Sequence, residues 1–127
     1  MFARKVSVCL KSGKLHEFAN LMQSEILVWL RQQEGFLDLI TLVAPNGCEV
    51  ATITFWDHEV SAQCWNVSGY PEALKTLEGL LDGLPYVKTF EVVGSTLHRL
   101  TLTNGDAASR VRQTERELYL RTFETNA

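Results

Sequence analysis

Three histidines are the first residues to consider for chemistry, and they are scattered along the chain. His16 lies near the start of the first expected helix, His58 follows the third expected strand, and His98 ends the fourth. They include no i,i+4 pair and no adjacent cysteine, so a metal site would have to be assembled entirely by the fold. We therefore expect no metal, and surface or capping roles for all three. His58 is the candidate proton acceptor, because it opens the expected helix that carries Trp65.

The three cysteines, Cys9, Cys48 and Cys64, contain no C-x-x-C pair. An odd number without that spacing indicates a reducing compartment, with no disulfide framework and no thiolate zinc site. We expect Cys9 and Cys64 to be buried as small apolar side chains. Cys48 falls in an expected hairpin turn and has no basic neighbour that would activate its thiol. This use of cysteine predicts a cytoplasmic protein.

Length and charge exclude several classes of protein. The chain has 127 residues, 46% of them hydrophobic, which fits one globular domain with a substantial core. Its net charge of −3 argues against non-specific binding to nucleic acid. No apolar run reaches the roughly 18 residues of a membrane-spanning helix, and no apolar signal segment follows Arg4 and Lys5. We expect a soluble protein that binds neither nucleic acid nor a membrane.

Four segments have the patterns expected of strands. In the first, apolar residues alternate with polar or small ones. The second and third flank Asn46-Gly47, a strong hairpin signal because both residues tolerate positive φ. The fourth is long, and Gly94 within it indicates a bulge or bend. The expected strands cover residues 2–10, 36–44, 49–57 and 86–98.

Two helical segments separate these strands. From about residue 14 to residue 33, apolar residues recur every three or four positions and form one stripe, made of Leu15, Phe18, Met22, Ile26, Trp29 and Leu30. The second helix is interrupted at Gly69-Tyr70-Pro71, and its second piece begins with Pro71, where a missing N–H has no cost. In its first piece we expect Val60, Cys64 and Val67 to share the buried face.

The order β-α-β-β-α-β predicts an α+β, ferredoxin-like fold with a four-stranded antiparallel sheet and both helices on one face. The residues expected to face the helices are Val6, Val8, Leu10, Ile53, Phe55, Phe90 and Val92. Those expected on the opposite face are Ser7, Cys9, Leu39, Thr41, Val43, Thr52, Thr54, Trp56, Thr89 and Val93, with the charges Lys5 and Glu91. That face is too apolar for water, so we expect a homodimer with two sheets packed face to face.

The C-terminal part of the chain differs from the rest. Residues 107–123 are rich in Arg and Glu and have only a thin apolar stripe. This pattern is compatible with a solvated helix, a partner-docking arm or a partly disordered segment. We assign residues 1–99 to the domain and residues 100–127 to a C-terminal extension.

Several segments between residues 3 and 98 carry a family resemblance. They are ARKVSVCLKSGKLHEFANLM, EILVWLRQQEGF, EVATITFWD followed by HEVSAQCWN, and VKTFEVVGSTLH. Eight residues separate two tryptophans across the strand-to-helix junction, and a glycine follows the first strand. Together these segments resemble the antibiotic biosynthesis monooxygenase domain of the dimeric α/β-barrel superfamily. The resemblance implies a dimeric α/β barrel with a pocket between the helices and the sheet of each subunit. The superfamily includes cofactor-free oxygenases of anthrones or quinols, heme-degrading oxygenases and members without an assigned activity.

The resemblance places a substrate site at the start of the second helix. Trp65 matches the family's pocket tryptophan, and Asn66 and Tyr70 could donate hydrogen bonds to a phenolate or quinone oxygen. The alternative is structural: Trp65 is then a large core aromatic, Asn66 a polar helix residue and Tyr70 a half-exposed residue at the helix break. Oxygenation without a cofactor needs an electron-rich substrate that reduces O₂ once deprotonated. The resemblance thus implies a small quinol- or anthrone-like aromatic substrate and no cofactor.

The heme-degrading branch does not fit this chain. That branch combines a strand asparagine and the helix tryptophan with an axial histidine about ten residues further on. Here the first strand has no asparagine, and Lys75, ten residues after Trp65, has no lone pair for iron when protonated. The expected function is a cofactor-independent monooxygenase. The alternative is a non-catalytic small-ligand binder or a structural homodimer with the same fold.

Overall fold

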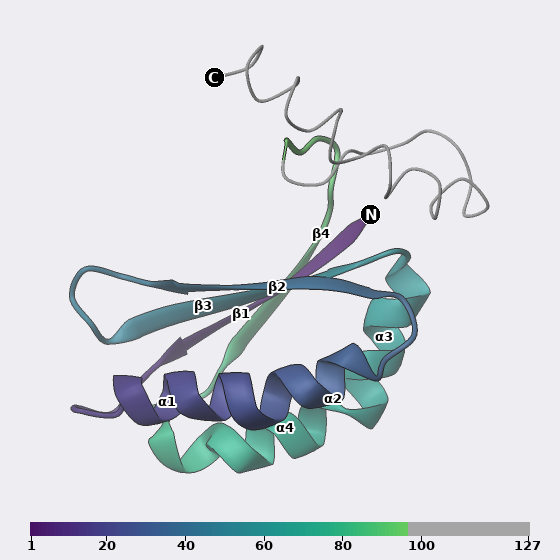
Figure 1. Cartoon of the computed structure of the whole chain (residues 1–127). Coiled ribbons are helices and arrows are strands. Elements are labelled where there is room, and N and C mark those ends of the chain that lie inside the picture. Colours follow the sequence, from purple (N-terminus) through teal and green to yellow (C-terminus); the bar gives the residue numbers. More distant parts are fainter. Residues whose placement is uncertain (97–127) are drawn as a thin grey trace. The chain divides into compact units, whose positions relative to one another are not determined.

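Four strands pair into one antiparallel sheet in the computed structural model, which describes residues 1–96 (Figure 1). They are β1 (Phe2–Cys9), β2 (Phe36–Val43), β3 (Glu49–Trp56) and β4 (Tyr86–Glu91). Their order across the sheet is β2-β3-β1-β4, so β1 lies between β3 and β4. This topology confirms the expected α+β, ferredoxin-like fold.

The helices cover one face of the sheet (Figure 1). The first helical segment consists of α1 (Leu15–Leu21), the π-helical turn η1 (Met22–Ile26) and α2 (Leu27–Arg31). The second is broken at Gly69, as expected, into α3 (Glu59–Ser68) and α4 (Tyr70–Leu77), followed by the 3₁₀ turn η2 (Glu78–Leu80). None of the helices in residues 1–96 is long and apolar enough to cross a membrane.

The fourth strand is shorter than the sequence predicted. β4 ends at Glu91, which pairs with Phe2 at the very start of β1. Phe2 is the first residue of β1, so the ladder between β1 and β4 stops at this pair. The compact unit that contains the sheet and the helices likewise spans Met1–Glu91. His98 and the extension expected over residues 100–127 lie outside the described residues.

The faces of β2, β3 and β4 are the reverse of the expected assignment. Val6 lies opposite Thr52 and Val87 in the observed register, and directly paired residues share a face. The residues that unexpectedly face the helices are Leu39, Thr41, Val43, Thr52, Thr54, Trp56, Thr89 and Glu91, whereas Ile53, Phe55 and Phe90 lie on the other side. Both alternating sets of β3 are apolar enough to fill a core, so its composition did not distinguish them.

The face away from the helices, here called the open face, carries several large apolar side chains. The register places on it Ala3, Lys5, Ser7, Cys9, Asp38, Ile40, Leu42, Glu49, Ala51, Ile53, Phe55, Tyr86, Lys88 and Phe90. Leu42, Tyr86 and Phe90 are exposed. The reason for expecting a partner on this face therefore holds, with a different set of residues.

The core lies between the helices and the sheet. Its largest fully buried side chains are Phe18, Leu30, Val50 and Trp56. The Trp56 indole N–H donates to Thr54 Oγ1 at 2.8 Å, and the Thr54 hydroxyl donates to the Arg4 carbonyl oxygen at 3.3 Å. These two bonds satisfy polar groups whose burial without partners would be costly.

The buried face of α3 also differs from the expected one. Ala62 and Trp65 are buried, whereas Val60, Cys64 and Val67 are exposed. Cys64 was expected to be buried, but it is a free, exposed thiol. The weakly amphipathic sequence of α3 offers two apolar faces, and the large indole of Trp65 is on the one that is buried.

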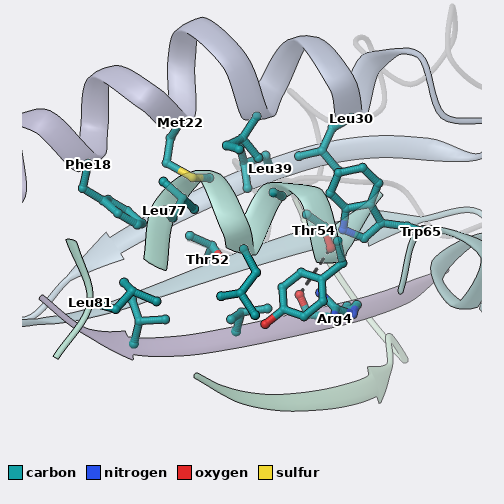
Figure 2. A pocket seen from close by; sticks show the side chains of 16 residues that line it. Arg4, Phe18, Met22, Leu30, Leu39, Thr52, Thr54, Trp65, Leu77 and Leu81 are labelled. Atoms are coloured by element: carbon teal, nitrogen blue, oxygen red, sulfur yellow. Dashed lines mark hydrogen bonds between the residues drawn. The ribbon is translucent and has the colours of Figure 1, made fainter. Parts of the chain in front are cut away.

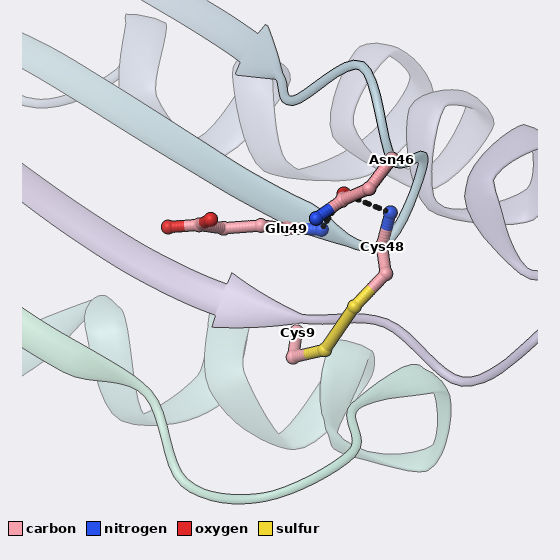
Figure 3. The surroundings of a disulfide bond; sticks show 4 residues. All are labelled: Cys9, Asn46, Cys48 and Glu49. Carbon is pink, nitrogen blue, oxygen red and sulfur yellow. Dashed lines mark hydrogen bonds between the residues drawn. A yellow bond between two sulfur atoms is a disulfide. The ribbon is translucent and has the colours of Figure 1, made fainter.

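Cys9 and Cys48 form a disulfide, contrary to the expectation of unpaired thiols (Figure 3). The two residues are 39 positions apart, and the pairing of β1 with β3 brings their Cα atoms to 5.3 Å. Sequence spacing alone could not show this proximity. In the adjacent turn, Asn46 Oδ1 accepts hydrogen bonds from the backbone N–H groups of Cys48 and Glu49, at 3.0 and 3.3 Å. The disulfide thus ties the end of β1 to the β2–β3 hairpin.

The disulfide predicts a redox-dependent stability. Closing a loop between residues 39 positions apart restricts the unfolded chain, and such cross-links typically contribute about 2–4 kcal/mol. Reduction with dithiothreitol, or Cys48→Ala, should lower the free energy of unfolding in urea by about that amount. Cys64→Ala is the control and should leave it unchanged. Equal stability of the oxidised and reduced wild-type protein would contradict the prediction.

Candidate functional site

A cavity lies between the helices and the sheet (Figure 2). It contains about 540 Å³ of empty space, counting the solvent at its mouth. Its lining comes from β1, β2, β3 and both helical segments, and consists of Arg4, Val6, Val8, Phe18, Met22, Ile26, Leu30, Leu39, Thr52, Thr54, Trp65, Tyr70, Ala73, Leu74, Leu77 and Leu81. Figure 2 shows Trp65 and Arg4 at one end of the cavity and Phe18 and Leu81 at the other.

Short side chains on the sheet leave the space that the cavity occupies. Thr52 and Thr54 of β3 line it from the sheet, while the longer Phe18, Met22 and Leu30 reach toward it from the first helical segment. Larger residues on the strands would fill the gap between the two layers. The threonines also add hydroxyl groups to a lining that is otherwise mainly apolar.

The π-helical turn keeps one helical stripe directed at the cavity. Phe18, Met22, Ile26 and Leu30 follow one another at four-residue intervals, and all line the cavity. In a regular α-helix such a spacing drifts around the axis by about 40° a step, because a turn has 3.6 residues. The wider turn of η1 takes up part of this drift. All four side chains are between 1% and 6% exposed.

Trp65 is 3% exposed and forms one wall of the cavity. Its ring centroid lies 6.3 Å from that of Trp56, with the two ring planes tilted by 32°. Gly69, one turn later at the helix break, lies against this indole: a Cβ at Gly69 would collide with Cζ3 and Cε3 of Trp65. The glycine that breaks the helix is therefore also the residue that makes room for Trp65.

Arg4 is the polar residue at this end of the cavity, and only 2% of its surface is exposed. Its Nη2 donates to Asn66 Oδ1 at 2.7 Å, and its guanidinium carbon lies 4.0 Å from the centroid of the Tyr70 ring. Burial lowers the pKa of Arg4 from its ordinary value, and the adjacent Tyr70 acts in the opposite direction. Because a guanidinium is protonated in proteins even when its pKa is lowered, the side chain stays charged.

The sequence-predicted residues Trp65, Asn66 and Tyr70 come together around Arg4, but they hold different positions. Trp65 and Tyr70 line the cavity. Asn66 is exposed and contacts the cavity only through Arg4. The Tyr70 hydroxyl is buried and has no hydrogen-bond partner in the described part of the chain.

His58 lies apart from this group. Its side chain is 66% exposed, and it does not line the cavity. It is the N-cap residue of α3, where its backbone N–H donates to Asp57 Oδ1 at 2.6 Å. The same carboxylate accepts from the Ser61 hydroxyl at 2.7 Å, so Asp57 organises the start of the helix. Within residues 1–96, no group of three histidine, cysteine or acidic side chains could hold a metal ion.

Arg4 is a charged residue of the cavity lining that the sequence analysis did not identify. Arg4 stands two residues from both Phe2 and Val6, so the period of two already placed a cation on the same face as the apolar residues of β1. A charged residue on a core-facing position is the signal that could have indicated it, because lone buried charges are rare.

Solved structures with the same fold include oxygenases. A monooxygenase from the gene ActVA-Orf6 of Streptomyces coelicolor, in complex with the ligand nanaomycin D, matches 74% of this chain and 88% of its own, with 20% identity and a TM-score of 0.65. A mutant of SnoaB, a cofactor-independent oxygenase from Streptomyces nogalater, matches 74% and 94%, with 12% identity and a TM-score of 0.62. NE2512, a protein of unknown function from Nitrosomonas europaea, matches 82% and 95%, with 17% identity and a TM-score of 0.63.

These likenesses show that the chain has the fold of antibiotic biosynthesis monooxygenases. No family model matches the sequence, and neither does any curated protein. The fold expected from the sequence is thereby confirmed, whereas activity at the cavity has to be argued from its residues.

The contact between Gly69 and Trp65 predicts the effect of a single methyl group. Gly69→Ala should displace the indole or strain the helix break, and overpacking of this kind typically lowers stability by about 1–3 kcal/mol. Gly79→Ala is the matched control, because a Cβ there meets nothing within 4 Å. Urea unfolding followed by circular dichroism measures both variants. Equal stability of the two would show that Trp65 does not depend on Gly69.

Proposed function

We propose that this protein is a cofactor-independent monooxygenase that oxidises a small quinol- or anthrone-like aromatic molecule in the cavity. The observation that carries the proposal is the aromatic and apolar cavity bounded by Phe18, Trp65 and Tyr70, in a fold that the ActVA-Orf6 monooxygenase and SnoaB share. A flat apolar substrate fits such a lining, with a few polar groups at one end to orient it.

The cavity suits a reaction in which the substrate provides the electrons. An anthrone-like substrate loses a proton to become an electron-rich anion, which then reduces O₂. One oxygen atom forms the new carbonyl group at the carbon, and the other leaves as water with the two hydrogens of that carbon. The chain's own part is to hold the ring near Trp65, to direct its oxygen toward Tyr70, and to exclude water.

Asn66 and His58 have different places in this proposal. Asn66 positions Arg4 through the 2.7 Å hydrogen bond, so its effect on substrate is indirect. The exposed side chain of His58 is not needed for the reaction as described. Among residues 1–96, no histidine or carboxylate lines the cavity, so the reaction as described uses no base from this part of the chain.

We also propose that the open face is the interface of a homodimer, which would complete a dimeric α/β barrel. Leu42, Tyr86 and Phe90 are exposed there beside Ile53 and Phe55. Apolar patches of this kind usually mark an interface. The register places four charged residues on this face: Lys5 and Lys88, which lie opposite each other on β1 and β4, and Asp38 and Glu49 on β2 and β3.

A cytoplasmic location, expected from the sequence, is part of the proposal. The cytoplasm keeps thiols reduced, so Cys9 and Cys48 would be present there as free thiols and would form the observed disulfide only on oxidation.

Oxygen uptake tests the proposed reaction. With anthrone as substrate, the wild-type protein should consume O₂ and form anthraquinone, and Trp65→Ala should lose at least about tenfold in kcat/KM because the ring is no longer held. Val67→Ala, two residues later on the exposed side of α3, is the control and should keep full activity. Binding of anthrone without uptake of O₂ would instead favour a non-catalytic ligand-binding protein.

Light scattering tests the proposed dimer. The wild-type protein should have twice the 14.3 kDa mass of the chain. Phe90→Glu would place a charge in the open face and should shift the protein toward monomer, since a buried unpaired charge is costly. Leu84→Glu, at a residue that is 94% exposed and outside the sheet, should leave the dimer intact. A monomeric wild-type protein at micromolar concentration would contradict the proposal.

A further inference from the structure

Arg4 is a buried cation without a counter-ion in the described part of the chain. It is 2% exposed, it lines the cavity, and the ion pairs found within residues 1–96 do not include it. Removing a charged side chain from water is expensive unless a partner of opposite charge compensates it. The charge of Arg4 therefore does not serve the stability of the protein by itself, which points to a role in binding.

The hydrogen bonds of Arg4 leave most of its donors unused. A guanidinium has five N–H donors, and in the described residues it donates to one acceptor, the neutral amide oxygen of Asn66. The Tyr70 ring covers one side of the guanidinium, whose carbon lies 4.0 Å from the ring centroid. Asn66 and Tyr70 thus fix the orientation of the cation but do not neutralise its charge.

A second buried polar group at the same end of the cavity also has no partner. The hydroxyl of Tyr70 is buried and makes no hydrogen bond to any described residue. Buried polar groups in folded proteins are nearly always paired, so an unpaired one in a cavity wall indicates a missing acceptor or donor. Of the described residues that line the cavity, Arg4 and Tyr70 are the only titratable ones, and none is acidic or a histidine.

We propose that this end of the cavity binds a single anionic oxygen group, a phenolate or a carboxylate, attached to an aromatic ring that occupies the apolar remainder. Arg4 supplies the charge and Tyr70 a hydrogen bond, while Trp65, at the same end of the cavity, contacts the ring. Arg4 is then the residue that selects an anionic over a neutral ligand. The inference rests on the cavity used in the proposed function and specifies its ligand, but it does not require turnover.

Paired probes test the selection by charge. Benzoate and benzamide have nearly the same shape, but only benzoate is charged at pH 7. Calorimetry should show at least about tenfold tighter binding of benzoate to the wild-type protein, the difference expected for a charge-assisted hydrogen bond. Arg4→Met, which keeps the length and removes the charge, should abolish this preference without weakening the binding of benzamide. Arg31→Met, at an exposed arginine of α2, is the control and should keep it.

Two further measurements separate the possible roles of Arg4. Asn66→Asp would place a carboxylate at the position that accepts from Arg4 Nη2, so it should weaken benzoate binding several-fold by supplying the missing counter-ion. If Arg4 were only structural, Arg4→Met would lower the melting temperature. We expect it to be unchanged or higher, because the isolated buried charge is removed.

The phenolate form of the ligand has its own probe. Para-nitrophenol changes its absorbance on ionisation, and binding beside Arg4 should lower its pKa in the wild-type protein but not in Arg4→Met. A benzoate preference identifies a carboxylate ligand, and a lowered nitrophenol pKa identifies a phenolate. Three results would overturn the inference. The first is equal binding of charged and neutral probes by the wild-type protein, and the second is a benzoate preference and a nitrophenol pKa that do not change in Arg4→Met. The third is that no probe binds at millimolar concentration. A preference for anions without O₂ uptake would contradict only the proposed oxygenase activity. Uptake of O₂ without a preference for anions would contradict only this inference.

Discussion

The burial of one positive charge links the parts of this structure that form its site. Arg4 lies on β1, between β3 and β4, and reaches Asn66 on α3 and the ring of Tyr70 on α4. One guanidinium therefore joins the sheet to both pieces of the broken helix. Its backbone oxygen also accepts the Thr54 hydroxyl, which in turn accepts the indole N–H of Trp56. The polar end of the cavity is thus anchored in the most buried part of the core.

The rest of the cavity follows from differences in side-chain length and helix geometry. The threonines of β3 leave room above the sheet, and the π-helical turn η1 keeps the stripe that runs from Phe18 to Leu30 turned toward that room. At the other helix, Gly69 lets the indole of Trp65 lie against the helix backbone. An apolar chamber with a cation at one end suits a reaction in which a bound aromatic anion transfers electrons to O₂.

The sequence predicted the order of the elements, the hairpin and the helix break, because Asn46-Gly47 and Gly69-Tyr70-Pro71 act locally. It did not predict which face of β3 meets the helices. Each of the two alternating sets, one with Trp56 and the other with Ile53 and Phe55, contains large apolar side chains that could face a core. The pairing of Cys9 with Cys48 depends on strand neighbours distant in sequence. Trp65 and Tyr70 were located through a family resemblance. The role of Arg4 emerged only when its neighbours on α3 and α4 were known.

The most direct test is whether an aromatic anion binds inside the cavity, and the methionine methyl groups report such binding. Met22 lines the cavity, while Met1 is at the N-terminus and serves as an internal reference. In carbon-13 methyl spectra, addition of benzoate should shift the Met22 resonance through the ring current of the bound aromatic and leave Met1 unchanged. If calorimetry shows that benzoate binds but the Met22 methyl resonance does not shift, that result would contradict a ligand site between the helices and the sheet.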